Sequence, residues 1–575
     1  MKTLSILFSL LAGLTFNRVN AAPGYLDQAF GNAGKVTTVI GSGNNDPKTS
    51  ATLMGDGRIV VAGSAWNGSN DDFVVSRYNT NGSLDSSFNG TGIVTTALGS
   101  VDDRGYSVVV QNDGKIIAAG WFDSARNPDF ALVRYNTDGS LDTTFNGSGK
   151  VTTDLATGSD VHSYDVGNSV VLQGDGRIVV AGKTQVGSGP SKFALVRYNA
   201  NGSLDTAFNG TGKVITAIGG NDAVANSVAV QSDGKIVAAG YSNNGSDYDF
   251  EMVRYNANGS LDTTFNGTGM VATAIGSGND RGSSVAIQND GKIVVAGTSW
   301  SGNSMFALVR YNADGTLDTS FNGTGKVTTA INTNNSSCES VAVQNDGKIV
   351  AVGSAYVGSW NFALVRYNAD GTPDTGVNDT GKVITDIGGD NDGGYSVALQ
   401  ANGRIVVAGH STNGSDAKFA LVRYEIAPDT DQDGIPDQYE TGTGIYVSET
   451  DTGTNPLVAD TDGDGLKDGA EIYMYHSNPN VADTDGDGFS DGFEVNTGFN
   501  PVSAASTPDA LSTLRPAREF RFNAADGSSY RIEGSTDTQN WTTLETNIIG
   551  TGTAVTRFYV EEELGPRYFL RVRKN

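Results

Sequence analysis

The sequence predicts an all-β fold, and three observations lead to that prediction. One unit is written seven times, with an apolar-Arg-Tyr core that recurs every 56 to 63 residues. Within each unit the apolar runs have strand length and end at Asn-Gly or Asp-Gly turns, with no helical period. Glycine is unusually frequent, 76 of 575 residues, as in short strands joined by tight turns. The arginines of the seven cores are Arg77, Arg134, Arg197, Arg254, Arg310, Arg366 and Arg423.

The unit is clearest between Ser284 and Ile331. Its first two apolar runs, SVAIQ and KIVVAG, flank the turn Asn289–Gly291, which predicts a tight antiparallel hairpin. A third run, FALVRYN, is followed by a second turn at Asp314 and by a fourth run, KVTTAI. Each unit is therefore expected to contribute four antiparallel strands.

Seven four-stranded units of near-constant length indicate a seven-bladed β-propeller. The repeat region begins with the fourth-strand part of a unit, Lys35–Ile40, and ends at Phe419–Glu425 without a fourth strand of its own. We therefore expect the N-terminal strand to complete the last blade and close the ring. An open solenoid would carry distinct capping units at its ends.

The repeats resemble the delta-60 repeat family of bacteria in the motifs DGKIVVAG, FALVRYN and LDTTFNGTGKV. The resemblance extends from Tyr25 to Tyr424 and departs from the pattern at Pro373–Val377, where Val377 replaces the phenylalanine found at Phe321. It implies a secreted, propeller-like module with no assigned chemistry.

The first 22 residues have the features of a secretory signal peptide. Lys2 precedes an apolar run from Leu4 to Phe16, and a cleavage site follows at Ala21 or Ala22. Neither this run nor a later one reaches the ~20 apolar residues of a transmembrane helix. The single cysteine excludes an internal disulfide. We expect an exported bacterial protein, extracellular or at the cell surface, without a transmembrane anchor.

Acidic residues are concentrated in one part of the chain. The formal net charge is −26, which argues against nucleic acid as a partner. Between Asp429 and Glu494 there are 17 acidic residues and a single basic one, Lys467. Such a density of carboxylates requires bound cations or disorder.

Three twelve-residue stretches in this segment begin at Asp429, Asp460 and Asp483. Each carries carboxylates at positions 1, 3, 5, 9 and 12 and glycine at position 6, while position 7 can add a carbonyl oxygen; this spacing wraps a loop around Ca²⁺. The predicted ligands are Asp429, Asp431, Asp433, Ile435, Asp437 and Glu440; Asp460, Asp462, Asp464, Leu466, Asp468 and Glu471; and Asp483, Asp485, Asp487, Phe489, Asp491 and Glu494.

The segment also resembles thrombospondin type 3 calcium repeats, including the Asn-Pro pairs at Asn455, Asn478 and Asn500. The resemblance implies a spacer that calcium orders. The alternative is a solvated acidic linker.

A second set of carboxylates lies four residues before the first strand of a unit. In a propeller this strand is innermost, so the set could form a ring at one mouth of the channel and bind a cation or a polyhydroxylated ligand. Alternatively, each aspartate caps the turn that enters the strand. The set is Asp46, Asp103, Asp165, Asp280 and Asp392, with Ala223 and Ser336 in the other two units.

Changes in composition divide the chain into four parts. We expect a signal peptide at 1–22, the propeller at 23–426, the calcium-binding segment at 427–505 and a small β-sandwich at 506–575. The last part weakly resembles C-terminal modules of large secreted bacterial proteins, which implies binding or surface retention.

The sequence favours a non-enzymatic protein that binds calcium and uses its propeller for ligand binding or adhesion, with an extracellular glycan or a surface protein as partner. It contains no G-x-S-x-G elbow, phosphate loop or H-E-x-x-H motif. A polysaccharide lyase or hydrolase with its site in the channel remains open, as does a purely architectural role. An enzyme should gather non-repeated carboxylates, His or Tyr on one face. An adhesin should expose the loop tryptophans Trp66, Trp121, Trp300 and Trp360.

Overall fold

The computed structural model describes 26–42, 48–124, 127–155, 163–378, 380–389, 391–413, 416–425, 431, 433, 435, 437–448, 451–504, 517–523, 528–535, 542–549, 554–560 and 569–574. The expected signal peptide lies outside these residues. The chain divides into two units, 1–461 with 467–474 and 462–466 with 475–575, and each is described by itself.

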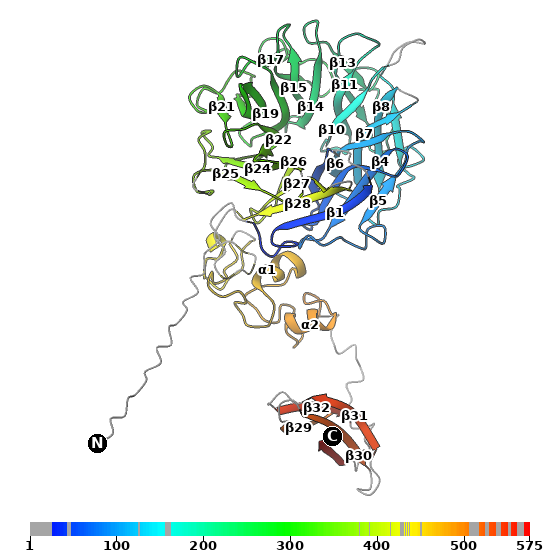
Figure 1. The fold of residues 1–575 in the computed structure, drawn as a ribbon, viewed down its shortest axis with the longest axis vertical. Helices are drawn as coiled ribbons and strands as arrows, with labels where there is room; N and C mark the ends of the chain where they lie inside the picture. The colour runs from blue at the N-terminus through cyan, green and yellow to red at the C-terminus, as the bar shows by residue number, and fades with distance from the viewer. Residues whose placement is uncertain are drawn as a thin grey trace, which may run out of the picture. The chain divides into compact units, whose positions relative to one another are not determined.

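Seven four-stranded antiparallel sheets are arranged as blades around a common centre, so the predicted seven-bladed propeller is confirmed (Figure 1). The strands are as follows: blade 1, β2 (Ser50–Leu53), β3 (Ile59–Trp66), β4 (Asp71–Tyr78), β5 (Ile93–Thr96); blade 2, β6 (Asp103–Val110), β7 (Ile116–Asp123), β8 (Pro128–Tyr135), β9 (Lys150–Thr153); blade 3, β10 (Val166–Leu172), β11 (Ile178–Thr184), β12 (Lys192–Tyr198), β13 (Lys213–Thr216); blade 4, β14 (Ala223–Val230), β15 (Ile236–Asn243), β16 (Tyr248–Tyr255), β17 (Met270–Thr273); blade 5, β18 (Asp280–Ile287), β19 (Ile293–Ser301), β20 (Asn303–Tyr311), β21 (Lys326–Thr329); blade 6, β22 (Ser336–Val343), β23 (Ile349–Tyr356), β24 (Trp360–Tyr367), β25 (Lys382–Thr385); blade 7, β26 (Asn391–Leu399), β27 (Ile405–Asn413), β28 (Asp416–Tyr424) and β1 (Lys35–Ser42).

The N-terminal strand closes the ring, as predicted. β1 pairs antiparallel with β28, from Lys35 opposite Val422 to Ser42 opposite Asp416. The last blade is therefore built from both ends of the repeat region.

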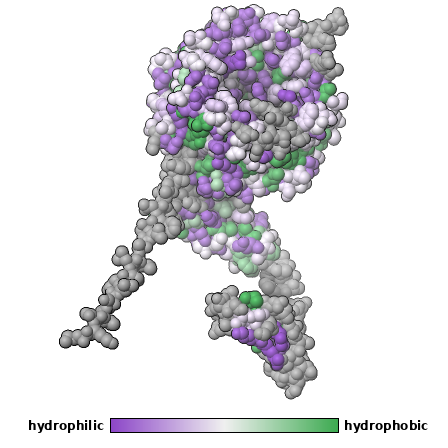
Figure 2. Space-filling model, viewed as in Figure 1, coloured by the Kyte–Doolittle hydropathy of each residue, from purple (hydrophilic) through white to green (hydrophobic). Residues whose placement is uncertain are grey.

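The core lies between the blades. On β3, Val60 and Ala62 pack with blade 2, whereas the alternate residues Ile59 and Val61 pack with blade 7. Because successive strand residues point to opposite faces, a central strand that is covered on both sides favours apolar residues at successive positions. This preference explains the continuous VVAG and FALV runs. Figure 2 shows hydrophilic residues spread over the propeller surface in this view.

Two hydrogen bonds recur at all seven joints between blades. A tyrosine hydroxyl from the third strand of one blade bonds to a threonine hydroxyl on the fourth strand of the preceding blade at 2.7–2.9 Å, as Tyr135 does to Thr96. A serine on the first strand accepts a backbone N–H from the next blade at 3.0–3.3 Å, as Ser107 does from Val170.

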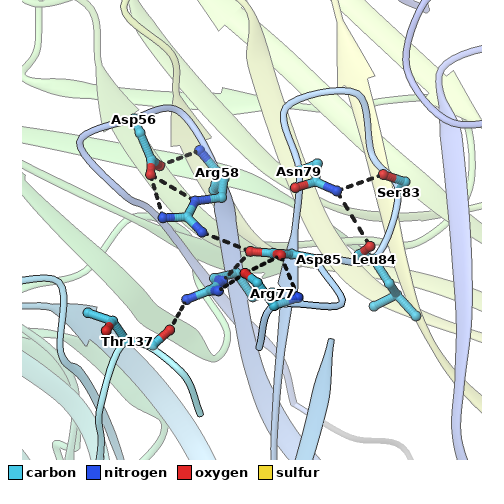
Figure 3. Close-up of polar contacts among 9 residues, drawn as sticks. Asp56, Arg58, Arg77, Asn79, Ser83, Leu84, Asp85 and Thr137 are labelled. Carbon is cyan, nitrogen blue, oxygen red and sulfur yellow. Dashed lines mark hydrogen bonds and ion pairs between the residues drawn. The ribbon is translucent and has the colours of Figure 1, made fainter. Parts of the chain in front are cut away.

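The repeated arginine and aspartate also serve packing. Figure 3 shows Arg77, whose Nε lies 2.6 Å from Oδ2 of Asp85 and whose guanidinium also donates to the carbonyl of Thr137 in blade 2. Arg58 reaches the same Asp85 carboxylate at 2.8 Å. The Arg-Tyr and Leu-Asp pairs are therefore structural, as expected for residues that recur in every unit.

Short helical turns and a few strands follow the propeller. The turns begin at position 9 or 12 of the acidic loops: η1 (Asp437–Tyr439), α1 (Asp468–Ala470), η2 (Glu471–Tyr475) and α2 (Asp491–Thr497). None of the helices that the structure describes is long and apolar enough to cross a membrane. In the C-terminal part, a two-stranded and a three-stranded sheet are formed by β29 (Ala517–Asn523) with β32 (Ala554–Val560), and by β31 (Thr542–Ile549), β30 (Ser529–Ser535) and β33 (Phe569–Lys574).

Candidate functional site

The third acidic loop gathers its carboxylates around one point. Asp483, Asp485 and Asp487 each place an oxygen within 4.8 Å of the others. Calcium–oxygen distances are 2.3–2.6 Å, so oxygens that share one ion lie at most about 5 Å apart. The loop geometry therefore fits Ca²⁺. The same holds for Asp431, Asp433 and Glu440 in the first loop and for Asp460, Asp462 and Asp464 in the second.

Backbone hydrogen bonds orient these carboxylates. Oδ1 of Asp485 accepts the N–H of Asp487 at 3.1 Å, and Oδ1 of Asp487 accepts the N–H of Phe489 at 2.9 Å. The other oxygen of each, Oδ2, is buried and accepts no hydrogen bond from the residues that the structure describes. Oδ2 of Asp431 in the first loop is in the same state. Buried carboxylate oxygens without donors are what a bound cation would satisfy.

Glu494 completes the third loop from the first turn of α2. Its side chain is buried, and neither carboxylate oxygen accepts a hydrogen bond within the described part of the chain. Burial, followed by the charges of Asp485 and Asp487, raises the pKa of Glu494 to about 7. A bidentate glutamate at position 12 is the ligand that such a loop needs. The residues present therefore fit calcium.

The structure places the aspartates at position 9 in hydrogen bonds with their own loops. Asp468 and Asp491 are fully buried, and each accepts two hydrogen bonds from the threonine at position 2 of its loop. Thr484 donates its N–H to Oδ1 of Asp491 at 2.9 Å and its hydroxyl to Oδ2 at 2.6 Å. Thr461 does the same for Asp468 at 2.7 and 2.6 Å. These carboxylates fasten the loop, and the Asp-Thr-Asp sequence is the signal that could have shown it.

The structure also gives the positions of the remaining predicted ligands. Ile435, Leu466 and Phe489 occupy position 7, and the first two are buried. Glu471 is buried at the start of η2, and Asp437 lies at the start of η1. Asp429 lies outside the described residues.

The structure places the described aspartates of the second set at the turns that enter the first strands, and the Oδ1 of each is buried without a hydrogen bond from the described residues. Each of the four described aspartates is fully buried, and its Oδ2 accepts a backbone N–H from the preceding turn: Asp103 from Leu98 at 2.6 Å, for example. Burial raises the pKa of Asp103 to about 6. The Oδ2 bonds are those of a cap on the turn that enters the strand, and Asp46 lies outside the described residues. The bonds from Leu155, Ile275 and Ile387 to Asp165, Asp280 and Asp392 measure 2.7, 2.6 and 2.8 Å.

The residue directly before the repeated serine of each first strand, and not the aspartate, lines the channel. A β-bulge lies just before the repeated serine in six blades, between Gly105 and Ser107 in blade 2 for example, and the bulged residue contributes to a polar cavity of about 170 Å³. Bulges redirect side chains and are frequent next to functional sites. Sequence reasoning missed this position, although it is the variable residue before an invariant serine. The channel position holds Thr49, Tyr106, Asn168, Asn226, Ser283, Glu339 and Tyr395.

Basic and aromatic side chains meet on the blades around this cavity. Lys48 Nζ lies 5.5 Å from the ring of Tyr106, and both line the cavity. Lys183 Nζ lies 4.8 Å from the ring of Tyr164. Burial lowers the pKa of Lys183; Asp222 opposes this shift, and the charge of Lys48 adds to it.

The four tryptophans do not form one exposed set. Trp300 is 49% exposed, but Trp121 is buried, with the guanidinium of Arg104 5.7 Å from its ring. Trp360 is partly buried and packs edge-to-face with Tyr356 at 5.8 Å. Trp66 is partly buried as well. Only Trp300 therefore has the exposure expected of an adhesin contact.

Two family models match the chain. A β-propeller domain of unknown function, DUF5122, matches seven segments, and the bacterial TSP3 repeat matches the second and third acidic loops at 460–482 and 483–504. TSP3 repeats bind calcium and are typical of extracellular proteins. The seven DUF5122 segments are 55–88, 111–145, 173–208, 231–265, 288–321, 344–376 and 400–425.

Solved propellers are similar at low identity. A protein of unknown function from Dyadobacter fermentans is 12% identical, with 68% of this chain and 99% of that chain covered and a TM-score of 0.36. A PL25 ulvan lyase is 13% identical, with 68% and 96% covered and a TM-score of 0.41. A streptogramin B lyase is 12% identical, with 68% and 97% covered and a TM-score of 0.35. Similarity of this degree identifies no activity. No curated protein matches the chain.

Proposed function

We propose that this chain, which is built from DUF5122 β-propeller repeats followed by bacterial TSP3 repeats, is an exported, calcium-stabilised protein whose propeller binds a ligand at its central channel. The TSP3 loops supply the calcium sites, and the bulged residues of the inner strands supply the ligand contacts.

The proposal rests on the contrast between two adjacent positions of the first strand of each blade, the repeated serine and the bulged residue before it. Ser107 and its counterparts are identical in every blade because each makes the same bond to its neighbour. The bulged residue one position earlier varies among Tyr, Asn, Ser and Glu. Its two asparagines, Asn168 and Asn226, donate to a backbone carbonyl of the next blade at 2.9 and 2.8 Å. Packing explains the repeated serine, whereas ligand recognition explains the unlike residues next to it.

The hydroxyls and amides of the lining favour a polyhydroxylated ligand, and we infer an acidic one that pairs with Lys48 rather than with Glu339, the acidic residue of the lining. Serine hydroxyls and asparagine amides of the lining can exchange hydrogen bonds with sugar hydroxyls. Tyr106 and Tyr395 offer ring faces for the apolar side of a sugar, and Lys48 offers a positive charge in a protein of net charge −26. An acidic extracellular glycan combines these properties.

A glycan array with the calcium-loaded protein tests this part of the proposal. We expect binding to acidic glycans, and at least a ten-fold loss for the double variant K48A/Y106A. Lys235→Ala is the matched control, because Lys235 pairs with Asp262 at 3.3 Å and does not line the cavity. Equal binding by K48A/Y106A and the wild type would contradict the channel as the site.

Chelation tests the calcium part. Without calcium, the clustered carboxylates repel one another, so EDTA should open the segment between Asp429 and Asn500 to protease. Extracellular modules bind calcium at about 10⁻⁴ to 10⁻³ M, so ~2 mM calcium should restore resistance. Cleavage at the same rate with and without EDTA would count against calcium as the ordering ion.

A second candidate, a polysaccharide lyase or hydrolase, rests on a separate observation. Tyr395 and Glu339 line the channel from neighbouring blades, and the ring of Tyr395 stacks on His410 with centroids 5.4 Å apart. Tyrosine, histidine and carboxylate are groups that can transfer protons to or from a substrate. Release of new reducing ends from an acidic glycan by the wild type, and its loss in Y395F and E339Q, would support an enzyme. Binding without cleavage would leave the first proposal.

A further inference from the structure

We propose a divalent-cation site at the joint between blades 2 and 3, formed by Asp129, Asp154 and Asp165 and separate from the TSP3 loops. Calcium is the ion that its chemistry favours.

Three different elements bring these carboxylates together. Asp129 is the second residue of β8, Asp154 directly follows the neighbouring strand β9, and Asp165 directly precedes β10 of the next blade. One oxygen from each residue lies within 4.8 Å of the others. Oxygens that share a calcium ion at 2.3–2.6 Å have this spacing.

A buried oxygen without a donor points to a ligand at this cluster. Asp129 is 8% exposed; its Oδ2 accepts the hydroxyl of Ser124 at 3.0 Å, whereas its buried Oδ1 accepts no hydrogen bond from the described residues. Leaving a buried carboxylate oxygen unsatisfied is costly. A cation held by the three carboxylates would satisfy it.

A neighbouring hydroxyl orients two carboxylates of the cluster, and one carboxylate is exposed to solvent. The hydroxyl of Ser163 lies 3.1 Å from Oδ1 of Asp154 and 3.0 Å from Oδ2 of Asp165, and so joins the two carboxylates. Lys213 approaches, but its Nζ donates at 2.5 Å to the backbone carbonyl of Asp154. Asp154 is exposed, so an ion can enter from solvent.

The repeat itself shows that packing does not require the cluster. Asp154 occupies the position directly after the fourth strand of its blade. Four other joints carry alanine at this position, and these joints form equally well. Among the six joints whose three positions are all described, only the one between blades 2 and 3 carries three carboxylates. The six sets are Asp72, Ala97, Asp103; Asp129, Asp154, Asp165; Lys192, Ala217, Ala223; Asp249, Ala274, Asp280; Met305, Ala330, Ser336; and Asn361, Asp386, Asp392.

The donor set selects the class of ion. Three carboxylates are hard oxygen ligands, which suit Ca²⁺ and Mg²⁺. The set contains no imidazole or thiolate, the ligands that structural zinc sites use. Calcium is favoured because three protein carboxylates around one ion suit its larger coordination number.

Calcium stoichiometry in the full-length protein tests the site. Asp154→Ala restores the alanine of the other joints, so the fold should be kept. We expect equilibrium dialysis at free calcium from about 10 µM to about 5 mM, a range that includes extracellular affinities, to show one ion fewer per chain in D154A than in the wild type. Asp386→Ala removes a carboxylate at the same repeat position in blade 6 and should bind as many ions as the wild type.

Two outcomes would overturn the proposal. One is equal stoichiometry in D154A and the wild type, and the other is the loss of an ion in D386A as well. Asp129→Asn gives a second test, with Asp249→Asn as its control, because Asp249 occupies the same position beside Ala274. Calcium-dependent protease resistance of the TSP3 segment should persist in D154A, which separates this site from the TSP3 loops.

Discussion

The repeated phenylalanine of each unit packs beneath a glycine of the following blade. A Cβ on Gly202 would lie 2.9 Å from the ring of Phe145, and a Cβ on Gly371 would lie 2.7 Å from the ring of Phe321. These glycines also have positive φ, 88° and 89°. Both the steric contact and the backbone conformation therefore require glycine.

The one departure from this pattern follows from the closure of the ring. Val377 takes the place of phenylalanine in blade 6, and its partner would be the turn after the third strand of blade 7. The chain leaves the repeat at Glu425, so that turn and its glycine do not exist. The sequence shows the substitution, but only the arrangement of the blades supplies its cause.

Glu251 is a buried carboxyl where six other blades carry Ala or Val. It is 2% exposed and accepts the hydroxyl of Ser242 at 2.9 Å, and burial raises its pKa from 4.5 to about 7. The folded state binds the proton of Glu251 more tightly than the unfolded state does. The stabilisation by Glu251 is therefore fully present below pH 4.5 and is lost as the pH rises through 7. We expect the free energy of unfolding to fall by about 3 kcal/mol over this interval.

Chemical denaturation between pH 4 and 8 measures this loss. The difference between the wild type and E251Q isolates Glu251, because the other titrating groups are common to both proteins. A difference that is constant with pH would show that Glu251 titrates normally.

The calcium loops depend on a threonine that is not itself a ligand. Thr484 supplies both hydrogen bonds that hold Asp491, and this contact ties position 2 of the loop to the first turn of α2. The template spacing predicted that Asp483, Asp485 and Asp487 would lie close together in the third loop. It could not predict that Asp491 is fully engaged by its own loop, because that depends on the direction of the side chain.

Removing the threonine hydroxyl should weaken the third loop. We expect Thr484→Val to lower its calcium affinity by about ten- to a hundred-fold, the usual effect of losing a group that orients a ligand shell. Isothermal titration calorimetry with calcium measures the change.

Thr497→Val is the matched control. Its hydroxyl bonds only to backbone carbonyls, those of Phe493 at 2.7 Å and Glu494 at 3.2 Å, and not to a carboxylate. Equal affinities in T484V and T497V would show that Asp491 does not need its threonine.

A buried ion pair between residues far apart in the chain joins the two ends of the propeller ring. Asp27 is 1% exposed and pairs with Arg423 at 2.6 Å, across 396 positions, and with Arg404 at 3.1 Å. Burial lowers the pKa of Arg423 to about 10, against the charge of Asp27. This ion pair repeats the one between Arg77 and Asp85, but here it joins the two ends of the ring.

Breaking the pair at the joint should release the N-terminal strand. Removal of one partner of a buried ion pair costs about 3–5 kcal/mol, so we expect Asp27→Asn to lower stability by that amount. Hydrogen exchange followed by mass spectrometry should show faster exchange in β1 (Lys35–Ser42).

Asp85→Asn removes the same contact inside blade 1 and is the control. It should be destabilising but leave exchange in β1 unchanged. Similar exchange of β1 in D27N and D85N would show that the ion pair does not hold the closing strand.

The architecture was predictable because each unit shows its own boundaries and the ends show how the ring closes. The cavity-lining positions were not, because the bulges at Tyr106 and its counterparts interrupt the alternation on which strand patterns depend. The cluster at Asp129 was also hidden, because its members lie 25 and 11 residues apart in sequence. The three aspartates come together only because β8 pairs with β9 and because the residue before β10 of the next blade lies beside them.

The pairing of β1 with β28 also sets an order for folding. Blades 1 to 6 each form from a continuous stretch of chain, whereas blade 7 must wait until residues near both ends of the repeat region exist. Contacts of long sequence separation carry the largest loop-closure cost and form slowly. Closure of blade 7 should therefore be the last step of folding. Until then the outer edge of β28 is an exposed strand edge, and a chain shortened at either end of the repeat keeps an open edge that can pair with another molecule.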